Sequence, residues 1–255
     1  MNLVKKTLTA CLMLAALPST LFAAGEEPLE GVKDLFDKGG FVMVIIVALS
    51  VIGVALAFER FVNLRRSRLV PKNLKEAMKS AQESGSAHDL KSILSAQATP
   101  LARILHVGMV RSNAGITEME RSMEAQGELE SAKLQRPIRP LGVIAQVEPL
   151  LGLLGTILGM ITTFNLLHTT SAAERVSKLA PGIGQALYTT AAGLAIAIPF
   201  VLIHHHLQGR VMKAAEEWSV MGTDLVELLH NSTERNEPKP AGVPEAEANE
   251  KAAVA

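Results

Sequence analysis

The stretch EPLLGLLGTILGMITTF, residues 148–164, decides the fold. It is apolar except for the glutamate at its start and three threonines, and it forms the middle of a longer apolar run, residues 141–167. A helix rises about 1.5 Å per residue, so about 20 apolar residues cross a hydrocarbon core about 30 Å thick. The run therefore predicts a membrane-spanning helix.

Two further runs are long and apolar enough to span a membrane, residues 41–59 and 181–203. Apolar residues make up 48% of the chain although aromatic residues make up only 4%, and they gather in blocks rather than in an amphipathic repeat. The sequence therefore predicts an all-α membrane protein with three transmembrane helices and a cytoplasmic helical domain.

The charges beside the spans predict the orientation. Six basic residues follow the first span between Arg60 and Lys75 with no acid among them, whereas acids predominate in front of it. The positive-inside rule places the basic flank in the cytoplasm and the N-terminus outside, as in a bacterial inner-membrane protein. The predicted order is a periplasmic segment 24–40, TM1 41–59, a cytoplasmic helical domain 60–136, TM2 141–167, a periplasmic loop 168–180, TM3 181–203, a cytoplasmic helix 204–230 and a disordered tail 231–255.

The N-terminus has the features of an export signal. Lys5 and Lys6 precede a short apolar run, and small residues near Ala23 offer a cleavage site, so residues 1–23 are interpreted as a signal peptide. The alternative is a membrane helix that the mature protein retains. Cys11 is the chain's one cysteine, and it lies too close to Lys6 for a lipoprotein processing site.

Small residues and prolines crowd the second and third spans. Small side chains let helix backbones approach closely where no hydrophobic force drives association, and a proline leaves a carbonyl without its usual donor. This composition predicts a tight oligomeric bundle rather than a lone anchor. The predicted packing residues are Pro149, Gly152, Gly155, Gly159, Gly182, Gly193 and Pro199.

Threonines follow the same helical spacing as these glycines. Thr156 shares a face with Gly152 and Gly159, and Thr190 shares one with Gly193. Opposed to each other, two such faces could line a narrow, partly hydrated cavity. Alternatively, each threonine bonds a carbonyl of its own helix, which is the commoner fate of a membrane threonine.

Carboxylates are nearly absent from these two spans. The third has none, and the second has only Glu148, near its cytoplasmic side. A proton carrier in the middle of a membrane normally needs an ionisable group, so a partner protein is expected to supply it. Glu148 is either an entry-side proton acceptor or a charge pair for Arg139, and the pairing is favoured.

Other kinds of site are not supported. Adjacent helix residues point about 100° apart, so the run 204–206 of three histidines cannot converge on one metal ion. No phosphate-binding loop, nucleophile elbow or carboxylate pair is present, and the net charge is zero. We expect no enzyme activity, metal, cofactor or nucleic-acid partner.

Beyond the third span, a heptad-like series of apolar residues suits helix packing. It packs either on neighbouring subunits or on the chain's own cytoplasmic domain. Its members are Leu207, Val211, Ala214, Trp218, Met221, Leu225 and Leu228.

Three groups of residues resemble the MotA/TolQ/ExbB proton-channel family, most closely its ExbB branch. PLLGLLGT at 149–156 is similar to the family's second-helix signature. APGIGQAL at 180–187, followed by TAAGL at 190–194, resembles the third-helix signature. Glu59-Arg60 is similar to the end of the family's first helix, and the resemblance covers about residues 40 to 230.

The resemblance implies a pentamer enclosing single helices of an ExbD/TolR-type partner, whose membrane aspartate would carry protons past Thr156 and Thr190. It implies a subunit that energises a TonB-type protein for outer-membrane transport. A TolQ-like subunit of the Tol-Pal system and a non-conducting membrane scaffold are the alternatives. ExbB and TolQ commonly carry Glu where this chain has Gln185, so a direct relay role is in doubt there, although a hydrogen-bonding role on the proton path remains.

Overall fold

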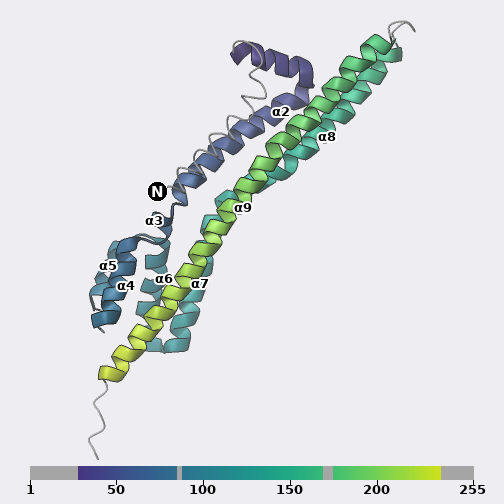
Figure 1. The fold of residues 1–255 in the computed structure, drawn as a ribbon. Helices are drawn as coiled ribbons and strands as arrows, with labels where there is room; N and C mark the ends of the chain where they lie inside the picture. Colours follow the sequence, from purple (N-terminus) through teal and green to yellow (C-terminus); the bar gives the residue numbers. More distant parts are fainter. Residues whose placement is uncertain (1–27, 85–87, 169–174, 237–255) are drawn as a thin grey trace, which may run out of the picture. The chain divides into compact units, whose positions relative to one another are not determined.

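The computed structural model describes residues 28–84, 88–168 and 175–236, and all regular elements in these ranges are helices (Figure 1). The elements are α2 (Pro28–Asn63), α3 (Arg66–Leu69), α4 (Lys72–Ser84), α5 (His88–Ala96), α6 (Pro100–Arg111), a 3₁₀ turn (Ser112–Ala114), α7 (Ile116–Gln135), a second 3₁₀ turn (Arg136–Ile138), α8 (Arg139–His168) and α9 (Arg175–Asn236). The predicted signal peptide, the centre of the periplasmic loop and most of the predicted tail lie outside the described residues.

Three helical stretches in the described ranges are long and apolar enough to cross a membrane: Gly39–Asn63, Ile116–Leu166 and Leu179–Ser232. The predicted spans 41–59 and 181–203 lie inside the first and third stretches, and the predicted span 141–167 overlaps the second up to Leu166. The predicted all-α membrane fold with three long apolar helices is therefore confirmed.

The chain divides into two compact units. We call the first the membrane unit; it comprises residues up to Arg65 and residues 131–213, and so holds α2, α8 and the first part of α9. We call the second the helical unit; it comprises residues 66–130 and the chain from Ala214 onward. Helix α9 contributes to both.

The membrane unit is held together by small apolar clusters between its helices. One joins Ala57 of α2 and Phe200 of α9 to three residues of α8, Leu141, Ile144 and Ala145. Another gathers Val42, Met43 and Ile46 of α2, with partly buried residues of α8 and α9 packed against them. Most other apolar side chains of these helices point outward, as expected of helices whose other faces meet lipid or neighbouring subunits.

Helix α2 is kinked at Gly40. The backbone there has φ 64° and ψ −167°, which is not helical, so α2 consists of two helical segments. A positive φ of this kind is accessible to glycine but strained for other residues. The segment before the predicted first span is thus helical from Pro28 and turns into the span at this glycine.

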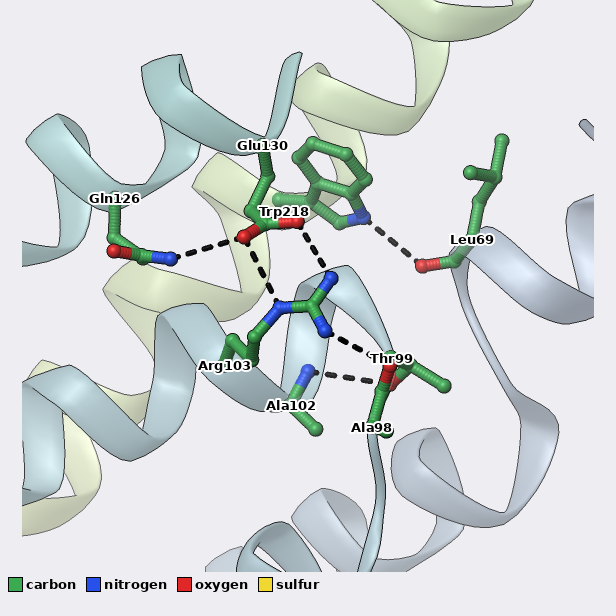
Figure 2. Close-up of polar contacts among 8 residues, drawn as sticks. All are labelled: Leu69, Ala98, Thr99, Ala102, Arg103, Gln126, Glu130 and Trp218. Atoms are coloured by element: carbon green, nitrogen blue, oxygen red, sulfur yellow. Dashed lines mark hydrogen bonds and ion pairs between the residues drawn. The ribbon is translucent and has the colours of Figure 1, made fainter. Parts of the chain in front are cut away.

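The helical unit packs α9 against its shorter helices. The indole Nε1 of Trp218 donates a hydrogen bond of 3.1 Å to the carbonyl of Leu69 (Figure 2). Carboxylate oxygens of Glu217 bind Arg66 at 2.6 Å and Lys75 at 2.9 Å. All seven residues of the heptad-like series are buried within this single chain: Leu207 and Val211 in the membrane unit and the other five in the helical unit. Packing on the chain's own helices accounts for them.

A buried ion pair ties α6 to α7 (Figure 2). Arg103 donates to both carboxylate oxygens of Glu130, from Nε at 3.0 Å and from Nη2 at 2.7 Å. Gln126 donates a third bond to the same carboxylate at 3.0 Å. The Glu130 side chain is 2% exposed whereas that of Arg103 is 44% exposed, so only the acid depends on the pair for solvation.

This asymmetry predicts unequal effects of substituting the two partners. Arg103→Met would strand a buried carboxylate and should lower the free energy of unfolding by about 3 kcal/mol, whereas Glu130→Gln keeps an acceptor and a donor and should cost about 1 kcal/mol. Trp218 is the chain's single tryptophan, so its fluorescence reports unfolding of this unit in detergent. Arg121→Met, at an exposed arginine of α7, is the control and should leave the midpoint unchanged. Equal losses for Arg103→Met and Glu130→Gln would contradict the argument.

Candidate functional site

Helices α8 and α9 pack antiparallel along a continuous seam. Glycines of α8 lie along this seam, because a Cβ added to any of them would contact α9. Going up α8, Gly152 faces Thr190, Gly155 faces Thr189 and Gly159 faces Ala186. The partner numbers fall as those on α8 rise, so the two predicted faces do oppose each other in one chain.

The backbones approach most closely at two of these glycines. A Cβ on Gly193 would lie 2.7 Å from the carbonyl oxygen of Glu148, and one on Gly152 would lie 3.1 Å from the carbonyl oxygen of Thr189. Backbone atoms cannot rotate away as a flexible side chain could. Helices α8 and α9 therefore pack closely at these two glycines, and glycine is required there for steric reasons.

The threonines of the seam use their hydroxyl groups as donors to backbone carbonyls. Thr156 donates to Leu153 at 2.6 Å, Thr163 to Gly159 at 2.7 Å and Thr189 to Ala186 at 2.8 Å. These are bonds within one helix, the alternative considered from the sequence. Thr190 differs, because its hydroxyl donates across the seam to the Gly152 carbonyl at 2.9 Å.

The faces do not leave a hydrated cavity between them in a single chain. The opposite helix occupies the space beside their glycines, since a Cβ added there would contact its atoms. Thr156 is only half-buried, and Thr162, one and a half turns on, is exposed. The Thr156 side chain therefore lies partly on the outer surface of the seam.

Glu148 occupies the buried face of α8. Its side chain is 0% exposed, and neither carboxylate oxygen has a hydrogen-bond partner among the described residues. It follows the apolar residues Ile144 and Ala145 by one turn and precedes Gly152 by one turn. The favoured pairing with Arg139 is not formed: Arg139 is exposed, and the described residues contain no ion pair between the two.

Gln185 lies far from Glu148 along the seam. Its amide Nε2 would be 3.1 Å from a Cβ on Gly40, so it lies against the kink of α2. Its neighbour Ala186 faces Gly159, which is 11 residues after Glu148 on α8, a distance of roughly 16 Å along the helix. The structure thus places Thr156, Thr190 and Glu148 within about two turns of α8, with Gln185 apart from them.

Two further close contacts were not predicted from the sequence. The Phe200 ring lies over Gly53 of α2, where a Cβ would be 2.6 Å from the ring. The His204 ring lies over Gly142 of α8 in the same way. In each pair the sequence offers only a single glycine in an apolar run. Such a glycine does not show which residue of another helix occupies the space that its missing side chain leaves.

Comparison with known proteins agrees with this geometry. Residues 96–220, which include α8 and the part of α9 that forms the seam, match the sequence model of the MotA/TolQ/ExbB proton channel family. The chain is 32% identical over 236 residues to "Putative biopolymer transport protein ExbB-like 1" of Synechocystis sp., and the match covers 89% of each chain.

Relatives from both main branches are present. "Tol-Pal system protein TolQ" of Haemophilus influenzae is 27% identical over 77% of this chain and 92% of its own. "Biopolymer transport protein exbB1" of Vibrio cholerae is 50% identical over a shorter match, 25% of this chain and 28% of its own. Similarity alone therefore does not separate the two branches.

Gly193→Ala tests the seam directly. The added methyl group would meet the Glu148 carbonyl, so the two helices must separate, and we expect a loss of about 2 kcal/mol in the stability of the membrane unit. The measurement is the thermal unfolding midpoint of the full chain in detergent. Gly184→Ala, on the same helix with nothing within 4 Å of the added Cβ, is the matched control. An unchanged midpoint for Gly193→Ala would show that the backbones are not in contact there.

Proposed function

The chain belongs to the MotA/TolQ/ExbB proton channel family, and we propose that it is the ExbB-like scaffold subunit of an inner-membrane motor driven by the proton-motive force. Family membership makes it a membrane subunit of proton-channel type and not an enzyme. In the proposal it assembles as a pentamer around an ExbD-type single-span partner and energises a TonB-type protein. Its N-terminus is periplasmic after removal of residues 1–23, and its C-terminus is cytoplasmic.

One observation carries the proposal: the described residues of TM2 and TM3 hold small and hydroxyl side chains along one seam but a single carboxylate, Glu148. A path of this composition can guide a proton, yet it lacks a titrating group in the middle of the membrane. The partner's membrane aspartate supplies that group in the proposal. Thr156 and Thr190 flank its route, because their hydroxyl oxygens keep acceptor lone pairs after donating to carbonyls.

Glu148 acts in the proposal as the cytoplasmic-side proton acceptor of the same route. A charged carboxylate without a partner is very costly in an apolar interior, whereas its protonated form is far less so. The geometry of Glu148 suits a group that binds a proton, since no cation lies within bonding distance of its oxygens in the described chain. Gln185 contributes hydrogen bonding beside Gly40 and binds no proton.

A TolQ-like subunit of the Tol-Pal system is the second candidate, because a TolQ relative matches over 92% of its own length. Deleting the gene in its native host separates the two. Loss of energised uptake of iron chelates with an intact envelope supports the ExbB-like role. Detergent sensitivity and outer-membrane leakage with normal uptake support the TolQ-like role.

A non-conducting scaffold differs from both, because its glycines and threonines serve only packing. Proton flux through the purified chain and its ExbD-type partner, reconstituted in vesicles with an imposed pH gradient, decides this. Absence of flux in a correctly assembled complex would support the scaffold.

Thr156→Val and Thr190→Val should each abolish energised uptake while the complex still assembles. Valine keeps the shape of threonine but removes the hydroxyl group that the route requires. Thr190→Val also removes the bond to Gly152, which should cost about 1 kcal/mol of stability and no more. Uptake of a labelled iron chelate measures the first effect, and cross-linking to the partner measures assembly.

The control for both variants is Thr162→Val. Thr162 lies on the same helix but about 120° around it from Thr156, so it is on a different face from the proposed route, and uptake should remain normal. Full uptake in both Thr156→Val and Thr190→Val would remove these residues from the proton route.

Glu148→Gln should lower proton flux at least tenfold without lowering stability, because glutamine keeps the volume of glutamate but binds no proton in this pH range. Arg139→Gln is the discriminating control. If Glu148 and Arg139 formed a charge pair, both variants would show the same loss; the observed geometry predicts that Arg139→Gln retains normal flux. Flux through the reconstituted complex is the measurement in both cases.

A further inference from the structure

Three chain segments meet in one apolar cluster at the end of the membrane unit that follows TM1 and TM3. Leu64 comes just after α2, Ile138 just before α8, and Leu207 and Val211 from α9. All four side chains are at most 1% exposed. Partly buried Phe61 packs against this cluster, which we call the rim cluster.

Each segment brings an arginine next to its apolar residue. Arg65 follows Leu64, Arg139 follows Ile138 and Arg210 precedes Val211. Because the rim cluster draws these segments together, the backbones that carry the three cations lie near one another, and Arg65 is close enough to Arg210 to affect its pKa. Arg136 and Lys213 lie in the same segments.

These cations lack acidic partners. Segments 53–65, 131–147 and 203–213 contain seven lysines and arginines but one acid, Glu59. Glu59 binds its neighbour Arg60 at 2.7 Å. None of Arg65, Arg136, Arg139, Arg210 and Lys213 forms an ion pair or side-chain hydrogen bond with the described residues.

Phe61 holds part of this basic group in place. The Arg210 guanidinium lies over its ring, 5.8 Å from the centroid, and the His206 ring stacks on it at 5.8 Å with an interplanar angle of 13°. His206 and Arg210 are four residues apart, so both project from one face of α9. Burial, and then the nearby Arg65, lower the pKa of Arg210, which is consistent with like charges held close together.

We propose that Arg65, Lys213 and Arg210, the last of which lies over the Phe61 ring, bind the phosphate headgroup of an anionic phospholipid of the cytoplasmic leaflet. Crowded cations without acids are stabilised by an anion, and planar guanidinium groups match phosphate geometry. Basic sites between membrane helices on the cytoplasmic side suit anionic headgroups.

The position along the helices favours a lipid over a free phosphate. Phe61 lies three residues beyond Phe58, near the end of TM1, roughly 5 Å along the helix. Arg210 lies seven residues beyond Ile203, the end of TM3, roughly 10 Å along α9. These distances match the headgroup layer that borders the hydrocarbon core, where lipid phosphates are permanently concentrated.

Lipid titration of the delipidated full chain in detergent tests the proposal, with bound lipid counted by native mass spectrometry. Dioleoyl-phosphatidylglycerol should bind at least tenfold more tightly than dioleoyl-phosphatidylcholine. Arg65→Gln with Arg210→Gln should weaken phosphatidylglycerol binding by about tenfold or more and leave phosphatidylcholine unaffected. The matched control is Arg111→Gln with Arg121→Gln, two exposed arginines of the helical unit, which changes the net charge equally and should alter binding less than twofold.

Phe61→Leu gives an independent test that keeps every charge. It removes the platform of Arg210, and phosphatidylglycerol binding should weaken about threefold while gel filtration confirms a folded chain. Unchanged phosphatidylglycerol binding in the Arg65/Arg210 variant, or equal binding of the two lipids by the native chain, overturns the proposal. Displacement of the lipid by an equal concentration of glycerol 3-phosphate overturns the lipid assignment. Since the assay uses neither partner nor proton gradient, its failure leaves the motor proposal untouched.

Discussion

The arrangement of the membrane unit depends on how closely α8 and α9 approach each other. Lipid tails are as apolar as the helix surfaces, so burying leucine against leucine gains little there, and association relies on van der Waals contact and hydrogen bonds. Glycine permits this contact because it has no Cβ. A Cβ added to Gly152 or Gly193 would lie 3.1 Å or less from a carbonyl oxygen of the opposite helix. This close approach fixes the separation and register of the two helices. Helix α2 also packs against α9 at a glycine, because the Phe200 ring lies over Gly53, which has no Cβ.

Close approach also decides what the polar side chains can do. A threonine in a dry seam must donate its hydroxyl proton to something, and the nearest acceptors are carbonyls. Thr156 and Thr189 use their own helices, whereas Thr190 reaches the Gly152 carbonyl because α8 is near enough. One side chain therefore serves both as a tie between the helices and as an oxygen with free lone pairs. The same residues therefore contribute to helix packing and to the proposed proton route. For this reason, assembly and proton flux must be measured separately for each substitution.

The sequence was sufficient to predict the three spans and the opposed small-residue faces, because apolar length and helical spacing are local properties. It could not show which way each threonine donates or that Glu148 lacks a partner. Both depend on the rotation of one helix against another, which no single helix encodes. The pairing of Glu148 with Arg139 was a reasonable expectation from charge alone, but nine residues separate them and they lie on different faces, one buried and one exposed. The contact of Gln185 with Gly40 was also hidden, because it joins positions 145 residues apart.

The placement of Glu148, the single carboxylate of TM2 and TM3, follows from these constraints. Below Glu148 on the same face, Ile144 and Ala145 belong to an apolar cluster, and above it Gly152 leaves no side-chain volume. Neither neighbour can stabilise a charge, so this carboxyl group must either bind a proton or have its charge stabilised by a group from another chain. At the opposite end of the seam, Gln185 lies against the α2 kink as a neutral amide that needs no such compensation. Within TM2 and TM3 the described residues thus place their one carboxylate at a single level of α8, and in the proposed motor the partner's aspartate supplies the titrating group at the other levels.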